Sequence, residues 1–363
     1  MKKIIWLVLA WIICINGFAL ITWNRFNVAQ DTAYTWIDPN HLHAPSWNPL
    51  KLPLRWDSEW YLGIARDGYS YKGPEALSNI VFFPVYPMLM RIVGFILLGN
   101  LVAAGWLISL AALVGACLVL AQLVKEFHPK LDPVLVVLLL LLFPTSIFFN
   151  AVYTESLFLL LSVASVYFIR KGRYREAGIL GFLAALTRVT GVLLFVLAAV
   201  EFFSQKNWKK QIPKGLWLLL IPLGLVAFFG YHAYAYGDPL IFFKIEANWG
   251  RSFTINAEHF LTATSSAATN LGLDIAFLVV GLITSLFVLK RVRLSYGLYM
   301  LATIAVAVST GTFMSIGRYI LVLFPIPIAI AHLKPEYRNI AMLASTLLLA
   351  LYTTLFAHSY WTG

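Results

Sequence analysis

The acidic residues Asp57 and Glu59 lie close together near the start of the aromatic stretch RWDSEWYLGIARDGY, which runs from Arg55 to Tyr69. A carboxylate within hydrogen-bond reach of a hydroxyl group can accept its proton, so this stretch could supply a general base. Helix capping is the simpler explanation, because Asp57 could be an N-cap and Glu59 a first-turn acid that the helix dipole favours. Caps are commoner than catalytic acids, and the residue types alone leave both explanations open.

Two arginines are further candidates for chemistry. Arg188 lies within the apolar segment 177–203. It could be only a charged turn residue, but a charge at that depth is costly and indicates function by default. Arg318 lies in the short turn GTFMSIGRY at 311–319, where it could equally anchor a helix at a membrane interface. What these side chains do therefore depends on the elements that position them.

The apolar composition determines what those elements are. Hydrophobic residues make up 60% of the chain and charged residues 12%, whereas soluble proteins carry about 25% charged residues. A soluble domain cannot bury so much apolar surface, but a membrane protein can, because lipid is its outer solvent. We therefore expect residues 1–363 to form a single all-α integral membrane domain.

Apolar runs near the ~20 residues that a bilayer requires predict about nine full spans. The N-terminal run is too long for a signal peptide and no cleavage site follows it, so we interpret it as an uncleaved first span. The other spans are expected at roughly 100–124, 133–151, 155–169, 215–235, 271–289, 294–311, 318–333 and 339–357.

The segment 177–203 needs a separate interpretation, because the polar sequence TRVTG interrupts it. If it crossed the membrane once, the basic runs RKGRYRE and KNWKKQIPKG would lie on opposite faces. If it is a re-entrant pair of short helices that turns at 187–191, both runs share one face. The second arrangement collects most Lys and Arg on one side, which the positive-inside rule assigns to the cytoplasm together with the N-terminus. The net charge of +11 then reflects contact with anionic membrane lipids, and no nucleic acid is expected as a partner.

The same topology places the loops 24–99 and 237–270 and the turn 311–319 on the extracytoplasmic face. The first loop is too long for an ordinary connection and too aromatic for disorder. Trp56, Trp60 and Tyr61 recur at helical spacing within it and predict a short amphipathic interface helix.

Glycine and proline mark the ends of the interface helices in the first outer loop. We expect the first helix to end at Gly68 and a second one to begin near Pro87. The run Phe82-Phe83-Pro84 between them is interpreted as packing at the membrane interface.

Five strings across most of the chain carry a family resemblance. In order they are RWDSEWYLGIARDGY, FFPVYPMLMRIV, FPTSIFFNAVYTESLFLLLS, AGILGFLAALTRVTGVLL and GRYILVLFPIPIAIA. Together they resemble the PIG-V-type mannosyltransferases (GPI mannosyltransferase II-like) and their prokaryotic relatives, in the GT-C superfamily of polyprenyl-phosphate-sugar-dependent glycosyltransferases. The chain is short and lacks large extra loops, so it resembles the prokaryotic members of the family more than the eukaryotic enzyme.

The resemblance implies a GT-C fold and an inverting transfer reaction on the outer face of the membrane. A hexose, expected to be mannose, would move from a polyprenyl or dolichyl phosphate donor to a hydroxyl of a glycan or glycolipid acceptor. Asp57 matches the aspartate that such enzymes place near the start of an interface helix, which implies the role of general base. Its charge would also stabilise an oxocarbenium-like transition state. The phosphate leaving group needs cations, and Arg318 and Arg188 are the candidates, since a guanidinium binds phosphate oxygens in two places.

Further residues could line the site, namely Arg55, Trp56, Glu59, Tyr153 and Glu155. Simpler explanations exist for several of them, since Glu59 could be a solvated acid and Tyr153 and Glu155 could merely end a helix pair. The histidines show no metal-ligand spacing, and the lipid-phosphate-sugar branch of the superfamily resembles a metal-independent one. We expect neither a metal site nor a cofactor.

A transporter or flippase of lipid-linked saccharides is the competing function. Many spans, a broken hairpin and an intramembrane arginine also suit that class. The sequence shows no internal repeat, however, and its polar chemistry gathers at one face rather than at the midplane. A structural membrane protein without activity would leave the long aromatic and acidic loop unexplained.

Overall fold

The computed structural model describes residues 1–27, 52–251 and 265–362, and within these ranges the regular structure is entirely helical. The all-α prediction is confirmed. In chain order the α-helices are α1 (Lys2–Arg25), α2 (Ser58–Asp67), α3 (Val85–Ile96), α4 (Leu101–Phe127), α5 (Pro133–Leu141), α6 (Glu155–Arg170), α7 (Tyr174–Ala185), α8 (Leu194–Phe203), α9 (Ile212–Gly215), α10 (Leu220–Tyr236), α11 (Ile241–Asn248), α13 (Ser265–Phe287), α14 (Leu294–Val308), α15 (Ile316–Leu321), α16 (Pro325–Ala331) and α17 (Pro335–Ala357).

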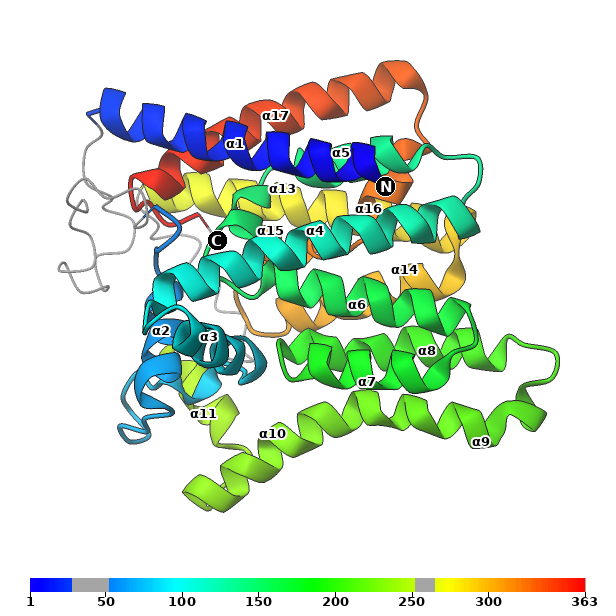
Figure 1. Cartoon of the computed structure of the whole chain (residues 1–363), viewed down its shortest axis with the longest axis horizontal. Coiled ribbons are helices and arrows are strands. Elements are labelled where there is room, and N and C mark those ends of the chain that lie inside the picture. The colour runs from blue at the N-terminus through cyan, green and yellow to red at the C-terminus, as the bar shows by residue number, and fades with distance from the viewer. Residues whose placement is uncertain (28–51, 252–264, 363) are drawn as a thin grey trace.

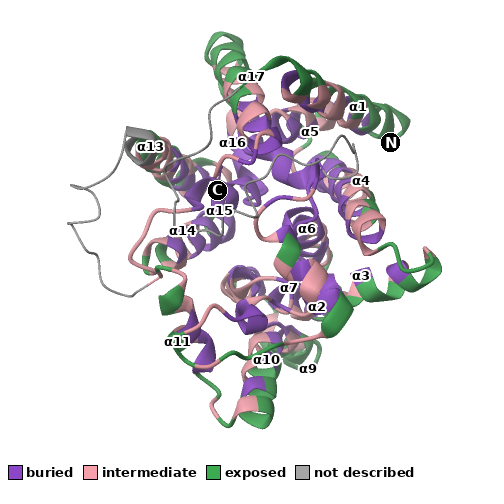
Figure 2. Cartoon of the chain, turned by 90° about the vertical axis from the view of Figure 1, so that its left-hand side faces the viewer, coloured by how far each residue is buried: buried purple, intermediate pink, exposed green. Residues whose placement is uncertain are grey.

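The longer helices run along one common direction, and α2, α3 and α11 gather at one end of the bundle (Figure 1). Seen from that end, the outward faces of α1, α10 and α17 are exposed while the helices inside are buried (Figure 2). The exposed outward faces are apolar, with Trp6, Val226 and Leu347 among their side chains. Apolar surface facing outward is what a lipid-embedded bundle requires.

Five helical segments in the described ranges are long and apolar enough to cross a membrane, namely Lys2–Arg25, Leu101–Phe127, Trp208–Tyr236, Thr269–Val292 and Pro335–Ala357. Two of the other expected spans, 133–151 and 318–333, are not continuous α-helices. The first ends at Leu141, close to Pro144, and a 3-10 helix follows at Ser146–Asn150; the second breaks before Pro325. Proline lacks the N–H that the helix ladder needs, which explains both breaks. The count of nine full spans stays a prediction.

The segment 177–203 is broken where its sequence predicts. Helix α7 ends at Ala185, and a 3-10 helix at Val189–Leu193 leads into α8. A side chain at Gly191 would approach the backbone of Ala184 to 2.4 Å, so this tight return depends on glycine.

The open ends of the helix pair lie together, because Gln205, just after α8, donates a hydrogen bond to the Tyr174 hydroxyl at the start of α7. Figure 1 shows α7 and α8 side by side, with their connecting turn toward the end that holds α2 and α3. A hairpin that enters and leaves the bundle at one end therefore agrees with the structure.

The basic clusters gather at the end of the bundle opposite α2, α3 and α11. Ion pairs join segments that are distant in the sequence, with Lys171 Nζ 2.8 Å from Glu126 Oε2 and Arg170 Nε 3.9 Å from Glu201 Oε2. Arg293 also pairs with Glu201. The charge asymmetry expected from the sequence is thus present between the two ends, and the assignment of the basic end to the cytoplasm stays a prediction.

Cysteine labelling can test this topology. In a chain whose two native cysteines are replaced by alanine, Lys171→Cys and Lys209→Cys should both be protected from a membrane-impermeant maleimide in intact cells. Lys72→Cys, in the exposed loop that follows α2, should be labelled. The physical reason is that a hairpin returns the chain to the side from which it entered. Labelling of 171 and 209 from opposite sides would refute the re-entrant pair.

The two short helices expected within residues 24–99 are present. Their position at the membrane interface on the extracytoplasmic face stays a prediction. Helix α2 ends at Asp67, and Gly68 follows with φ 89°, a conformation that favours glycine. Arg91 of α3 caps the same end of α2, because its Nε donates to the Ala65 carbonyl at 2.7 Å. Helix α3 begins at Val85, two residues before the predicted start, since Pro87 falls in the first turn where no backbone N–H partner is needed.

Candidate active site

A cavity of about 950 Å³ lies at the end of the bundle that holds α2, α11 and α15. Its volume is near the upper end of the ~300–1,000 Å³ typical of ligand pockets. Of the eight residues predicted for the site, six line the cavity, namely Arg55, Trp56, Asp57, Glu59, Arg188 and Arg318. Tyr153 and Glu155 lie behind its wall, fully or almost fully buried.

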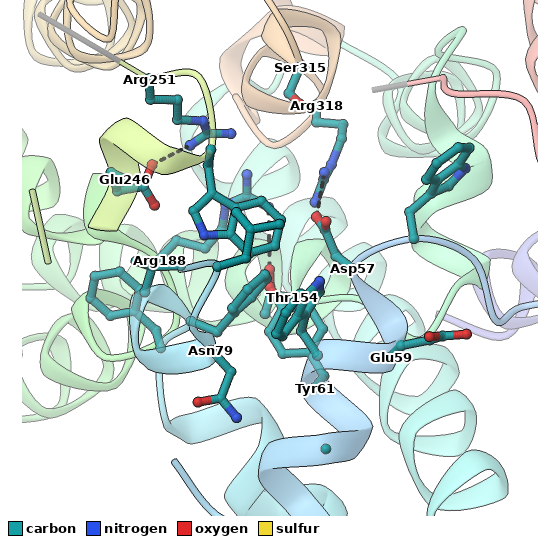
Figure 3. Close-up of a pocket in the computed structure, with 18 of the residues that line it drawn as sticks. Asp57, Glu59, Tyr61, Asn79, Thr154, Arg188, Glu246, Arg251, Ser315 and Arg318 are labelled. Carbon is teal, nitrogen blue, oxygen red and sulfur yellow. Dashed lines mark hydrogen bonds and ion pairs between the residues drawn. The ribbon is translucent and has the colours of Figure 1, made fainter. Parts of the chain in front are cut away.

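Asp57 faces the cavity and does not cap helix α2. It occupies the N-cap position, but its side chain makes no capping hydrogen bond. Its Oδ2 instead accepts a hydrogen bond from Arg318 Nη1 at 2.8 Å, and the side chain is 18% exposed (Figure 3). The capping explanation is therefore wrong, and the carboxylate is available to a ligand in the cavity.

The two residues before Asp57 are held by the end of helix α17. Trp56 has φ 53°, a left-handed conformation that is costly for a large side chain. Its indole N–H donates to the Tyr360 carbonyl at 3.3 Å, and Arg55 Nη2 donates to the Ala357 carbonyl at 2.9 Å. Arg55 lines the cavity as predicted, but its guanidinium binds carbonyls at a helix C-terminus, a favourable place for a cation.

Tyr153 positions the backbone of the same turn. Its hydroxyl donates to the Arg55 carbonyl at 2.9 Å and accepts a hydrogen bond from the Asp57 N–H at 3.1 Å. Because the hydroxyl is buried, these two bonds fix the direction in which Asp57 leaves the chain.

Glu155, the first residue of α6, joins the two predicted arginines. Its Oε1 accepts hydrogen bonds from Arg188 Nη1 at 2.7 Å and from Arg318 Nε at 2.8 Å, and its side chain is 0% exposed. A buried carboxylate is tolerated only when it is paired, and here two cations share one oxygen. The four residues form a continuous ionic chain from Asp57 through Arg318 and Glu155 to Arg188.

The ionic chain leaves guanidinium N–H groups for a ligand. Each guanidinium has five N–H donors. Arg318 donates from Nε and Nη1. Arg188 donates from Nη1, to Glu155 and, at 3.3 Å, to Thr154. Within the described part of the chain, neither of these arginines uses its Nη2 in a hydrogen bond. Arg188 also lies over the ring of Tyr319, 5.4 Å from its centroid. The pair can therefore still bind an anion between them.

Glu59 lies apart from this chain. It is exposed, and its carboxylate points away from Asp57 and Arg318 (Figure 3). The structure thus separates the two acids that the sequence places two residues apart.

Glu246 and Arg251 line the cavity but were not predicted from the sequence. They are 3.4 Å apart, and Arg251 Nη1 donates to the Tyr319 hydroxyl at 3.2 Å. Burial raises the pKa of Glu246 above its usual range, and the Arg251 guanidinium opposes this shift. Nothing in the sequence around them marks them as site residues, because only the fold brings α11 and the residues after it to the cavity.

The described residues contain no group of three or more His, Cys, Asp and Glu side chains that could hold a metal ion. His232 is buried, and its ring nitrogens lie 2.8 Å from the Phe228 carbonyl and 3.0 Å from the Ile80 carbonyl. It therefore has a structural role, whereas His259 lies outside the described residues. The expectation of a metal-independent site stays a prediction.

Residues 46–209 match the family model described as Mannosyltransferase (PIG-V). The resemblance inferred from the sequence is confirmed. The matched region contains Asp57, Glu155 and Arg188, whereas Arg318, Glu246 and Arg251 lie beyond it.

Two relatives of this family share about the same level of identity with the chain. GPI alpha-1,6-mannosyltransferase 2 of Rattus norvegicus is 31% identical over 184 residues, which are 43% of this chain and 36% of that protein. GPI alpha-1,6-mannosyltransferase 2 of Homo sapiens is 31% identical over 236 residues, which are 54% of this chain and 46% of that protein. The chain thus spans less than half the length of these relatives.

Among solved structures, the chain is similar to the crystal structure of ArnT from Cupriavidus metallidurans bound to undecaprenyl phosphate, with a TM-score of 0.53 and 16% identity. The similarity covers 94% of this chain and 64% of that one. It shows a shared fold, so the predicted GT-C fold is confirmed.

Proposed function

We propose that the protein is a membrane-embedded glycosyltransferase that moves a hexose, specifically mannose, from a polyprenyl or dolichyl phosphate to a hydroxyl of a glycan or glycolipid. The family match supports sugar transfer. The observation that carries the proposal is the ionic chain Asp57–Arg318–Glu155–Arg188 along one cavity, because it combines a proton acceptor with cations for a phosphate.

The reaction forms a bond from the acceptor oxygen to the anomeric carbon and breaks the bond from that carbon to the phosphate oxygen. The acceptor proton passes to Asp57, and the polyprenyl phosphate leaves on the opposite face of the sugar, which inverts the anomeric centre. The Nη2 groups of Arg188 and Arg318 bind the phosphate as its charge develops. Protonation of Asp57 weakens its ion pair with Arg318, which strengthens the hold of Arg318 on the leaving phosphate.

The same proposal locates the reaction at the extracytoplasmic face. The cavity is lined by residues of α2 and α11, which lie at the end of the bundle opposite the turn between α6 and α7 that carries a basic cluster. The positive-inside rule favours the cytoplasm for the basic end. A transporter would place its binding site near the midplane, whereas this cavity lies under the interface helices α2 and α11 at one end.

Purified protein in lipid nanodiscs can test the activity directly. Short-chain polyprenyl-phosphate-mannose carrying a radiolabel is the donor, and lipids extracted from the native membrane are the acceptor. We expect the label to move to an acceptor lipid or glycan. Transfer from the corresponding polyprenyl-phosphate-glucose should be slower than transfer from polyprenyl-phosphate-mannose. Failure of the wild-type protein to transfer or release labelled sugar, under conditions where it remains folded, would overturn the proposal.

The arginine assignment predicts a selective effect on the donor. Arg318→Ala should raise the KM for the lipid-phosphate donor by roughly 10- to 100-fold, since a hydrogen bond to a charged group contributes ~1.5–3 kcal/mol. Arg318→Lys should recover only part of this, because an ammonium cannot replace a planar fork. Steady-state kinetics with varied donor provide the measurement.

Arg173→Ala is a matched control, because Arg173 is an exposed arginine that also pairs with a glutamate. It should leave the donor KM unchanged. An unaltered donor KM in folded Arg318→Ala would instead assign Arg318 to anchoring its helix.

A further inference from the structure

The wall of the cavity across from Asp57 carries charged and aromatic side chains that are not part of the ionic chain. It is formed by Glu246 at the end of α11 and by Trp249 and Arg251, which follow that helix (Figure 3). Asp57 and Glu246 both line this cavity.

Three aromatic rings form one continuous surface on this side of the cavity, and we call Trp60, Phe82 and Trp249 the aromatic wall. Trp60 and Phe82 are nearly parallel, 6.0 Å apart at 12°, and Trp249 meets them edge-on at 5.0 and 5.7 Å. All three rings line the cavity. Phe83, the neighbour of Phe82, also lines the cavity and stacks on Phe228, with the ring centroids 4.2 Å apart. The interpretation of this run as packing at the membrane interface stays a prediction.

The aromatic wall carries a hydrogen-bond donor without a partner. The indole N–H of Trp249 is inaccessible to water and has no acceptor in the described part of the chain. Buried indole N–H groups normally find a partner, and Trp249 lines the cavity, so a small rotation of its ring would let a ligand supply the acceptor.

The adjacent ion pair suits hydroxyl groups. Glu246 and Arg251 are 3.4 Å apart, which is longer than a charge-assisted hydrogen bond, and their side chains are 15% and 23% exposed. A carboxylate accepts and a guanidinium donates, so neighbouring hydroxyls can bond to both at once. A phosphate would be repelled by Glu246, and a lipid chain would leave the pair without hydrogen bonds.

We propose that the aromatic wall with Glu246 and Arg251 is a subsite for a hexopyranose ring. The apolar face of the ring packs on the aromatic wall, two neighbouring hydroxyls bond to Glu246 and Arg251, and a ring oxygen accepts from the Trp249 N–H. The inference rests on the proposed function, because a glycosyltransferase must hold a sugar across from its base. The ring belongs either to the donor or to the acceptor, and the experiment distinguishes the two.

Binding of a free glycoside tests the subsite without turnover. The probe is methyl α-D-mannopyranoside, detected by saturation-transfer NMR with the full chain in nanodiscs. So small a ligand should bind with a Kd on the order of 1 mM. Glu246→Gln keeps the size of the side chain but removes its charge, and it should weaken binding by about tenfold. Trp249→Phe keeps a ring but removes the N–H and should weaken binding by roughly fivefold.

Glu176→Gln is the matched control, since it removes the partner of an exposed arginine at the opposite end of the bundle. It should bind the probe like the wild type. Thermal melts establish whether each variant is folded. If Glu246→Gln does not fold, Trp249→Phe still tests the subsite. The inference would be overturned if the wild type did not bind the probe, or if both folded subsite variants bound it with the affinity of the wild type.

Lipid competition assigns the sugar. If polyprenyl-phosphate-mannose displaces the probe and polyprenyl phosphate does not, the subsite holds the hexose of the donor. If the probe and the sugar-bearing lipid bind together, it holds a sugar of the acceptor. Displacement by polyprenyl phosphate alone would show that lipid occupies the wall and would refute the subsite. A protein that binds the probe and transfers no sugar would keep the subsite and overturn the proposed function.

Discussion

Asp57→Asn should fold and insert normally but lose sugar transfer by on the order of 10²–10⁴ in turnover, the usual contribution of a positioned acid or base. Asparagine has the size of aspartate, and its Oδ1 can still accept a hydrogen bond from Arg318. It cannot accept a proton from the acceptor hydroxyl. The measurement is single-turnover transfer with saturating donor, together with a thermal melt in nanodiscs.

The control for this substitution is Asp132→Asn. Asp132 is a true N-cap, because its Oδ1 accepts from the Val134 N–H at 2.9 Å, and asparagine caps about as well as aspartate. It should be silent in both assays. If Asp57→Asn transferred sugar at the parental rate, Asp57 would not be the base, and Glu246 would be the next acid of the cavity to examine.

Glu155→Ala should destabilise the protein by ~3–5 kcal/mol and reduce donor use, because the buried Arg318 and the largely buried Arg188 lose their shared partner. Glu155→Gln should have the same direction of effect with a smaller magnitude, since an amide oxygen still accepts hydrogen bonds but carries no charge. Thermal melts and the donor KM measure the two effects separately.

A double substitution separates positioning from stability. Combining Glu155→Gln with Arg188→Gln removes one of the two cations that lose their charged partner. The double variant should therefore be more stable than Glu155→Gln alone. Donor use should not recover, because a phosphate ligand is lost. Parental stability and an unchanged donor KM in Glu155→Ala would contradict the role given to this residue.

Local signals in the sequence predicted much of the helical framework. The apolar run expected at 155–169 is helix α6 at Glu155–Arg170, and the polar interruption at 187–191 coincides with the break between α7 and α8. Gly68 ends α2 as expected. These features depend on residues within a few turns of one another, and propensity and periodicity report on that range.

The parts that failed depend on contacts between distant residues. Asp57 was a plausible cap because capping is a local possibility, yet Arg318, 261 residues away, determines its orientation. Glu155 was only a possible lining residue, because nothing in its neighbourhood shows that arginines 33 and 163 residues away converge on it. Glu246 and Arg251 were missed for the same reason, since the fold alone brings them to the cavity.

The hold of α17 on the turn before Asp57 has a consequence for biosynthesis. Arg55 donates to the carbonyls of Phe356 and Ala357, 301 and 302 residues further along the chain. A ribosome that has completed α8 has already made Asp57, Tyr153, Glu155 and Arg188, but Arg318 and the α17 carbonyls that hold the turn before Asp57 do not yet exist. Contacts of such long sequence separation form late, after the intervening segments have folded. We therefore expect the site to assemble only after α17 has been translated and inserted, and the proposed sugar transfer to be absent from shorter nascent chains.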